Sequence, residues 1–308
     1  MRQIVFASGK GGTGKTTLAA LGAHLAAVTG GITLADCDVE AANLPIALKA
    51  RITRRDPFAG GAKAVIDAEV CRGCGACQPA CRFSALAAGD DFFRAHAFVV
   101  DPWACEGCGA CVPKCLDGAI RMEPSPAGEV FSAETVVGSM AFGQLLPGED
   151  LSGKLVTEVR ARARELAESR RSELMLIDGP PGVGCPAIAS ITNADLLVAV
   201  TEPTVSGEHD LVRLVALARR LGVRTAVVLN KADLSATGAS RIRDRVAAEG
   251  LELLGEVPFD PALADLLAGL AEGADATAAA GPGFDAARAV WQAVREVVLA
   301  VAPTGNHQ

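Results

Sequence analysis

Short apolar runs alternate with stretches of helical spacing along most of the chain. Uninterrupted runs of strand length predict strands at residues 4–7, 32–35, 173–178, 195–200, 224–230 and 251–257. Apolar residues at helical spacing between these runs predict helices at 15–28, 153–169, 186–193, 207–221, 237–249 and 284–301. Continuous apolar strands that alternate with helices are typical of a parallel sheet covered on both faces. The pattern therefore predicts an α/β fold with a mostly parallel sheet.

One stretch interrupts this alternation. Residues 63–125 are rich in Cys, Gly and Pro and carry only short strand signals, at 64–66 and 97–100. Gly and Pro residues mark both edges of the stretch, as is typical where regular structure ends. We therefore predict a discontinuous α/β domain, residues 1–62 and 126–308, with a small inserted α+β domain between its two segments.

The 63–125 stretch contains an internal repeat with eight of the ten cysteines. Each half carries the spacing C-x₂-C-x₂-C-x₃-C, in which three thiolates bind one [4Fe–4S] cluster and the fourth binds the other. Zinc is usually bound by separated C-x₂-C pairs, so it fits this pattern poorly. A half-module of this size is too small to bury a core alone, so we expect the halves to pack together. The predicted ligand sets are Cys71, Cys74, Cys77 and Cys115 for one cluster, and Cys105, Cys108, Cys111 and Cys81 for the other.

Composition restricts the class of protein. Half of the 308 residues are apolar, and the formal net charge is -7. Nucleic-acid-binding surfaces are usually basic, so we expect no nucleic acid partner. The apolar run near residue 4 is too short for a signal peptide, and no apolar stretch reaches the ~20 residues of a membrane span. We therefore expect a cytoplasmic protein, and that reducing compartment favours metal ligation over disulfides.

The first predicted strand leads into a phosphate-binding loop. Residues 9–16 read GKGGTGKT and fit the pattern G-x-x-x-x-G-K-[ST] between a strand and a helix. The glycines let backbone N–H groups converge on phosphate oxygens, and the helix N-terminus adds favourable partial charge. Lys15 is expected to reach the β- and γ-phosphates, and the Thr16 hydroxyl to ligate Mg²⁺. The predicted ATP-binding residues of the loop are Gly11, Gly12, Thr13, Gly14, Lys15, Thr16 and Thr17.

Lys10 places a second lysine in this loop. Residues 10–16 match K-G-G-x-G-K-[ST] and resemble the deviant Walker A ATPases, the superfamily of MinD-type and Mrp-type ATPases and the nitrogenase iron protein. The resemblance implies a homodimer in which two subunits sandwich two nucleotides and Lys10 reaches the partner's phosphates. Together with the cysteine repeat, the whole chain resembles MinD-superfamily P-loop NTPases with an inserted ferredoxin-like domain.

The resemblance assigns roles to residues outside the loop. Asp38, with Asn43 nearby, is expected to orient the attacking water, although a turn or helix-cap role would also explain both. Asp178 ends an apolar strand and is expected to bind Mg²⁺ through water. Asn230 and Pro258 are expected to contact the adenine, although a plain strand-end turn explains Asn230 nearly as well. The resulting catalytic set is Lys10, Lys15, Asp38 and Asp178.

The cysteine repeat departs from dicluster ferredoxins at one point. Those proteins usually have Pro directly after the fourth cysteine, where this chain has Arg82 and Leu116. Pro79 and Pro113 lie two residues before that cysteine instead. We expect the change to affect the solvent exposure and reduction potential of the clusters more than their ligation.

Two cysteines lie outside the repeat. Cys37 stands between two acidic residues at a strand end, and we expect it in the core. Cys185 follows Asp178 by seven residues, an offset similar to that of a cluster-ligating cysteine in the nitrogenase iron protein. Two copies of Cys185 would then hold a bridging cluster across a dimer. We favour the alternative, in which Cys185 is a small buried residue that packs its helix.

The motifs together predict an ATP-hydrolysing, Mg²⁺-dependent protein with two [4Fe–4S] clusters that couples nucleotide state to electron transfer to a partner protein. An alternative is ATP-dependent assembly or delivery of iron–sulfur clusters to an acceptor, as the Mrp-type resemblance implies, although no C-x-x-C site lies outside the insert. A further alternative is spatial organisation, as in MinD or ParA, with the apolar stretch 286–302 as a docking helix.

Overall fold

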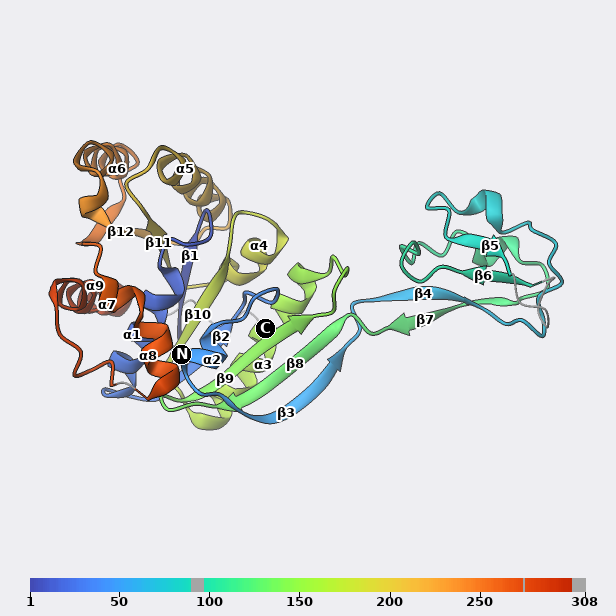
Figure 1. The fold of residues 1–308 in the computed structure, drawn as a ribbon, viewed down its shortest axis with the longest axis horizontal. Helices are drawn as coiled ribbons and strands as arrows, with labels where there is room; N and C mark the ends of the chain where they lie inside the picture. Colours follow the sequence, from blue (N-terminus) through green and yellow to red (C-terminus); the bar gives the residue numbers. More distant parts are fainter. Residues whose placement is uncertain (90–96, 274, 301–308) are drawn as a thin grey trace. The chain divides into compact units, whose positions relative to one another are not determined.

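The computed structural model describes residues 1–89, 97–273 and 275–300, which fold as two compact units (Figure 1). Unit 1 comprises Met1–Asp56, Glu129–Leu145 and Ser152–Gln308. Unit 2 comprises Pro57–Gly128 and Leu146–Leu151, so it contains the whole predicted insert and a short later segment. Within the described residues no helix is both long and apolar enough to cross a membrane.

Unit 1 is built on one large sheet in the order β13-β12-β11-β1-β10-β2-β9-β8-β3. The neighbours from β13 to β9 pair in parallel, so the predicted mostly parallel α/β fold is confirmed. The strands of this sheet are β1 (Arg2–Ser8), β2 (Ile32–Asp36), β3 (Arg51–Phe58), β8 (Gly128–Glu134), β9 (Ser139–Leu145), β10 (Leu174–Pro181), β11 (Leu196–Thr201), β12 (Thr225–Asn230) and β13 (Glu252–Val257).

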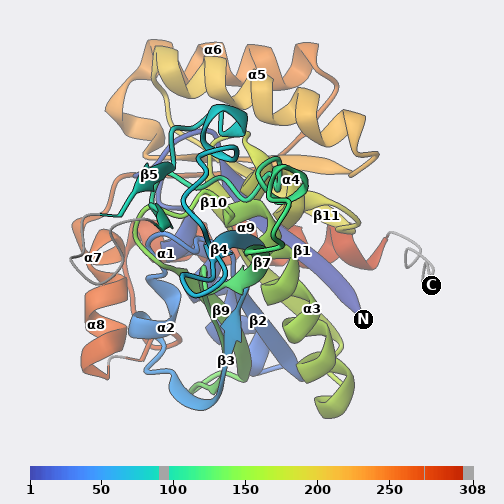
Figure 2. The ribbon, with the colours of Figure 1, turned by 90° about the vertical axis from the view of Figure 1, so that its right-hand side faces the viewer.

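Helices cover both faces of this sheet (Figures 1 and 2). One face is covered by α1 (Lys15–Ala27), α2 (Leu44–Ala47), α7 (Pro261–Ala264), α8 (Leu266–Glu272) and α9 (Pro282–Leu299). The other face is covered by α3 (Ser152–Arg170), α4 (Cys185–Ile191), α5 (Val205–Arg220) and α6 (Ala236–Ala248). This division follows from the right-handed crossovers that join parallel strands, because connections in opposite directions along the sheet lie on opposite faces.

The core on the α1 face uses alternate residues of the central strands. Ile4 and Phe6 of β1, Leu176 of β10 and Val198 of β11 belong to one buried cluster. Trp291 of α9 joins them and is 5% exposed. The intervening residues of the same strands are also buried, which is why these strands appear in the sequence as continuous apolar runs.

The sheet extends beyond the strands that apolar runs predict. β3, β8 and β9 form one end of it, and β3 is a mostly exposed strand rich in arginine. An exposed edge strand has no need of an apolar run, and charged side chains protect it from unwanted pairing. The predicted helix 284–301 is observed as α9, and residue 301 lies outside the described residues.

Unit 2 consists of two interlocked halves. β4 (Gly61–Ile66) pairs antiparallel with β7 (Ile120–Ser125), and β5 (Leu86–Ala88) pairs antiparallel with β6 (Phe98–Val100). The first strand of each half therefore pairs with the last strand of the other, so the two halves pack together as expected. A short 3₁₀ helix follows each group of three cysteines, at Gln78–Ala80 and at Val112–Lys114. The small core contains Ala64, Cys77, Leu86, Cys111 and Ile120.

Two glycines in the second cysteine run provide a matched pair. Gly107 and Gly109 both have left-handed backbones, with φ of 66° and 70°. A Cβ on Gly107 would lie 2.1 Å from the carbonyl oxygen of Ala62 on β4, whereas a Cβ on Gly109 would meet open space. Only Gly107 therefore lets the loop approach the neighbouring backbone this closely.

Gly107→Ala is expected to destabilise unit 2 much more than Gly109→Ala. Both variants carry the left-handed penalty of roughly 1–2 kcal/mol, and only Gly107→Ala adds a clash with the backbone of β4. Hydrogen exchange of the β4 and β7 amides in the metal-free chain measures the difference. Equal loss of protection in the two variants would contradict the close approach at Gly107.

Candidate functional site

The candidate nucleotide site lies at the carboxyl edge of the central strands. β1 runs between β10 and β11, and its end leads through the glycine-rich loop into α1. In register, Phe6 of β1 lies beside Asp178 of β10, which in turn lies beside Asp36 of β2. Ligands in open α/β sheets bind at this edge. The topology therefore brings the loop and two carboxylates to one place.

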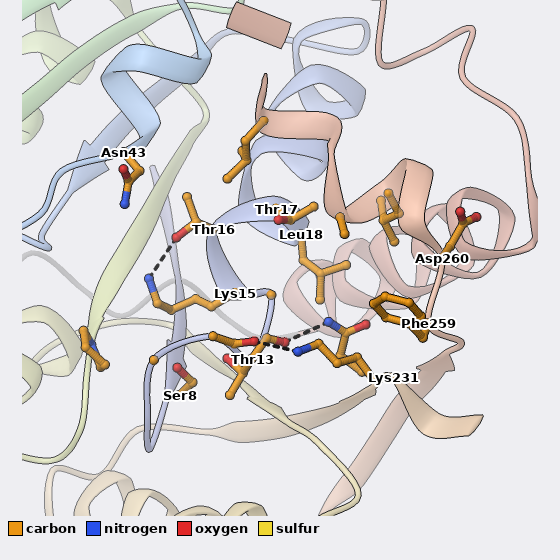
Figure 3. A pocket seen from close by; sticks show the side chains of 18 of the residues that line it. Ser8, Thr13, Lys15, Thr16, Thr17, Leu18, Asn43, Lys231, Phe259 and Asp260 are labelled. Carbon is orange, nitrogen blue, oxygen red and sulfur yellow. Dashed lines mark hydrogen bonds between the residues drawn. The ribbon is translucent and has the colours of Figure 1, made fainter. Parts of the chain in front are cut away.

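Two polar side chains from the end of β12 hold the glycine-rich loop (Figure 3). Asn230 donates its Nδ2 hydrogen to the carbonyl oxygen of Thr13 at 2.8 Å, and Lys231 Nζ donates to that of Gly12 at 2.8 Å. Gly14 has φ of 85°, and a Cβ there would lie 2.2 Å from Asn230 Nδ2. The loop is thus fixed before any phosphate arrives.

Buried Lys15 and Asp178 form a polar triad with half-buried Thr16. Lys15 Nζ lies 2.6 Å from Asp178 Oδ1, and the Thr16 hydroxyl donates to Asp178 Oδ2 at 2.7 Å. Burial alone would lower the pKa of Lys15, but the Asp178 carboxylate raises it above its ordinary value. Lys15 is therefore a buried cation whose partner is Asp178. Removing one member of a buried ion pair is costly, so Lys15 is expected to leave Asp178 only for another anion.

Asp36 is a site residue that the sequence did not single out. It is fully buried, and it accepts hydrogen bonds from the backbone N–H of Asp38 at 3.0 Å and of Leu44 at 3.1 Å. Burial, and then the nearby Asp178 carboxylate, raise the pKa of Asp36 to about 8. Asp36 therefore fixes the start of the segment that carries Asp38 and Asn43, and both of these line the pocket.

Lys10 is held within its own chain by Glu202, which the sequence also did not single out. Lys10 Nζ forms an ion pair with the Glu202 carboxylate and donates to Ser206 Oγ at 3.0 Å. Lys231 Nζ lies 3.4 Å from the same carboxylate. Burial tends to raise the pKa of Glu202, but the two lysines hold it below its ordinary value. Glu202 is therefore a charged acceptor for both lysines.

The loop opens into a pocket of about 460 Å³ (Figure 3). Its walls include most of the predicted nucleotide residues: Gly11, Gly12, Thr13, Gly14, Lys15, Thr16, Thr17, Asp38, Asn43, Asn230 and Pro258. Phe259, Leu263 and Leu267 add an apolar wall that the motifs did not indicate. Thr13 Oγ is buried and has no partner in the described part of the chain, which suits a phosphate or metal-bound oxygen.

Unit 2 gathers the eight repeat cysteines around two small pockets, which we call pocket A and pocket B. Each pocket takes three cysteines from one half of the repeat and the fourth from the other half. The reason is that the last cysteine of each half precedes a strand that pairs with the first strand of the other half. Pocket A is lined by Cys71, Cys74, Cys77 and Cys115. Pocket B is lined by Cys105, Cys108, Cys111 and Cys81.

Backbone donors point at the shared cysteine of each pocket. The Ala119 N–H donates to Cys115 Sγ at 3.2 Å, and the Ala85 N–H donates to Cys81 Sγ at 3.3 Å. Such bonds stabilise thiolates. Among the described residues, no three His, Cys, Asp or Glu side chains are close enough to hold a single metal ion. A cubane cluster spaces its thiolates more widely, because each binds a different iron.

The two cysteines outside the repeat differ from each other. Cys37 is fully buried, as expected, and burial raises its pKa far above the ordinary thiol value. Cys185 is exposed at the start of α4, so the interpretation of Cys185 as a small buried residue is wrong. The apolar positions of α4 that do pack inward include Ala187 and Ile191.

The fold and the loop define a P-loop nucleotide-binding protein. The chain belongs to the CobQ/CobB/MinD/ParA nucleotide-binding family, whose sequence model matches residues 4–269, and it is an ATPase of the MinD/ParA class. An uncharacterized protein of Methanocaldococcus jannaschii is 35% identical over 236 residues, 74% of this chain and 78% of that protein.

Two further comparisons extend this result. The carbon monoxide dehydrogenase accessory protein CooC of Rhodospirillum rubrum is 34% identical over 95 residues, 31% of this chain and 35% of that protein. The cell division ATPase MinD of Pyrococcus furiosus has a similar structure, with a TM-score of 0.57 and 18% identity over 96% of this chain and 99% of that one. At that identity, the likeness to MinD shows the fold alone.

Phe259→Ala is expected to weaken ATP binding about tenfold with little change in kcat, because base stacking on an aromatic ring contributes about 1–3 kcal/mol. Phe259 lies on the far side of the pocket from Thr16 (Figure 3), so it has no part in the phosphate chemistry. Titration calorimetry gives the affinity, and Leu234→Ala, an exposed change outside the pocket, serves as the control. Unchanged affinity in Phe259→Ala would place the base elsewhere.

Proposed function

We propose that this chain is a cytoplasmic, Mg²⁺-dependent ATPase that acts as a homodimer and carries two [4Fe–4S] clusters in unit 2. Its nucleotide state controls electron transfer from these clusters to a partner protein. The observation that carries the proposal is the convergence of the eight repeat cysteines on pockets A and B in one compact unit. This is the arrangement that the ferredoxin spacing requires.

The residues of unit 2 fit the clusters chemically. Each pocket offers four thiol groups and a backbone N–H donor to one sulfur. Burial raises the pKa of Cys77 and of Cys111, so these thiols would need bound iron to become thiolates at neutral pH. When bound, the clusters supply one-electron chemistry. The chain's own contribution is to set their number, their spacing and the charge around them.

The residues of unit 1 fit ATP with Mg²⁺. The Thr16 hydroxyl and the Asp178 carboxylate, which contact each other at 2.7 Å, are oxygen ligands suited to Mg²⁺, directly or through water. When bound, Mg²⁺ neutralises developing charge on the phosphates. Lys15 then exchanges Asp178 for the β- and γ-phosphates. Asp38, at the pocket wall, orients the attacking water.

Lys10 connects the proposed hydrolysis to dimer formation. To reach a partner's phosphates, its ammonium group must leave Glu202 and Ser206 of its own chain. Glu202 keeps a second cation, Lys231, when Lys10 departs. The carboxylate is therefore not left unpaired, which lowers the cost of releasing Lys10.

A short covalent path joins the nucleotide site to unit 2. The segment after Asp36 carries Asp38 and leads into α2, whose first residue, Leu44, donates its N–H to Asp36. The chain then continues into β3. β3 ends at Phe58, where the chain has already entered unit 2. We propose that nucleotide-dependent movement of this segment is transmitted to unit 2 along β3.

The partial likeness to CooC favours a second candidate function, delivery of metal clusters to an acceptor enzyme. The four cysteines that line each pocket favour tightly held clusters instead. Exposure of the loaded protein to a chelator separates the two candidates, because a carrier releases iron readily. Spatial organisation, which the likeness to MinD suggests at the level of fold, has no described surface that favours it.

Two double variants test the crosswise ligation. Cys77→Ser with Cys115→Ser removes two ligands of pocket A, so the chain should keep about four of its roughly eight irons. Cys77→Ser with Cys81→Ser removes one ligand from each pocket and should leave almost none. Iron and sulfide analysis after anaerobic reconstitution measures both. The reverse outcome would show that each run binds its own cluster, and iron-free wild-type protein would end the proposal.

Re-oxidation of the reduced protein tests the coupling. With cytochrome c as the acceptor, the rate is expected to differ several-fold between ATP, ADP and no nucleotide. Lys15→Ala removes the phosphate-binding ammonium group, so its rate should be the same in all three conditions at unchanged iron content. Stopped-flow absorbance follows the reaction. Equal wild-type rates with and without ATP would refute nucleotide control.

A further inference from the structure

The internal repeat allows the two cluster pockets to be compared residue by residue. The backbone turns are equivalent in the two halves: each first cysteine donates its N–H to the backbone carbonyl oxygen of the aspartate four residues earlier, at 2.9 Å for Cys71 and 3.0 Å for Cys105. The N–H···S bonds at the shared cysteines are also equivalent, at 3.2 and 3.3 Å. These two pairs of backbone hydrogen bonds therefore give no reason for the pockets to differ.

The charged side chains are not equivalent. After the first cysteine, pocket A has Arg72 where pocket B has Glu106. Before the fourth cysteine, pocket A has Lys114, whereas the matching residue of the other half is Ala80. Pocket A therefore gains two positive side chains that pocket B lacks, and pocket B gains a negative one.

Asp117 offsets part of this difference. It lines pocket A and lies 2.6 Å from Arg72, so this pair is close to neutral. Lys114 forms no ion pair among the described residues, so its charge in pocket A remains uncompensated. At the position that matches Asp117, pocket B has Phe83, an apolar side chain. Glu106 therefore faces no lysine or arginine among the residues that line pocket B.

We propose that this difference makes the two clusters unequal, with the cluster in pocket A at the higher reduction potential. Reduction adds negative charge to a cluster, so a nearby cation favours the reduced form and a nearby carboxylate opposes it. Arg82 beside Cys81 acts in the opposite direction, but it does not line pocket B. Electrons that enter unit 2 therefore collect in pocket A. The inference rests on the proposed function, because it requires both clusters.

Moving one lysine between the pockets tests the inference. Lys114→Ala gives pocket A the residue of the other half, and it should lower the higher of the two midpoint potentials. Ala80→Lys makes the converse change, and it should raise the lower midpoint potential. Lys114 is exposed and Ala80 is half-buried near the surface, so each shift is expected to be at most a tenfold change in the reduction equilibrium, which is about 59 mV for one electron.

Potentiometric titration with electron paramagnetic resonance, on reconstituted full-length protein, gives both potentials. Arg121→Gln is the matched control, because Arg121 is an exposed cation of unit 2 that lines neither pocket. It should move neither potential by more than the error of the measurement. Equal potentials in the wild type, or a Lys114→Ala shift confined to the lower potential, would overturn the inference. Both outcomes still require about eight irons per chain, so neither is confused with failure of the proposed function.

Discussion

The ion pair between Lys15 and Asp178 is the interaction on which the arrangement of unit 1 depends. It joins the glycine-rich loop after β1 to the end of β10, two strands that lie side by side but are far apart in the sequence. Both charges are almost completely buried, so neither tolerates loss of the other without a replacement. An anion that takes Lys15 therefore changes the environment of Asp178 at the same moment. This exchange gives the chain a means to register the presence of a triphosphate.

Much of unit 1 was predictable because its chemistry is local in the sequence. The loop motif, the apolar central strands and Asp178 at a strand end each follow from a few consecutive residues. Asp36 and Glu202 were not predictable in the same way, since their roles arise from residues that only the fold brings near. β3 escaped notice for a different reason: as an exposed edge strand it carries arginines in place of an apolar run.

Unit 2 shows that a repeat conveys more than its motifs do. The exchange of the fourth cysteine between halves was inferred from spacing, and the strand pairing of β4 with β7 supplies a physical reason for it.

The exposure of single residues was harder to infer from the sequence. Cys185 of unit 1 was expected to be a small buried residue that packs its helix, yet it is exposed at the first position of α4. Helix periodicity alone does not tell which way a first-turn residue faces.

The aromatic composition has a practical consequence. The chain contains two tryptophans and no tyrosine. Trp291 is buried beside α1 in unit 1, whereas Trp103 is 76% exposed in unit 2. A buried indole fluoresces at shorter wavelength than a solvated one, so the two emissions separate spectrally. Melting of unit 1 exposes Trp291 and moves its emission to longer wavelength, whereas Trp103 already emits near the solvated value, so intrinsic fluorescence of the unlabelled protein reports selectively on unit 1.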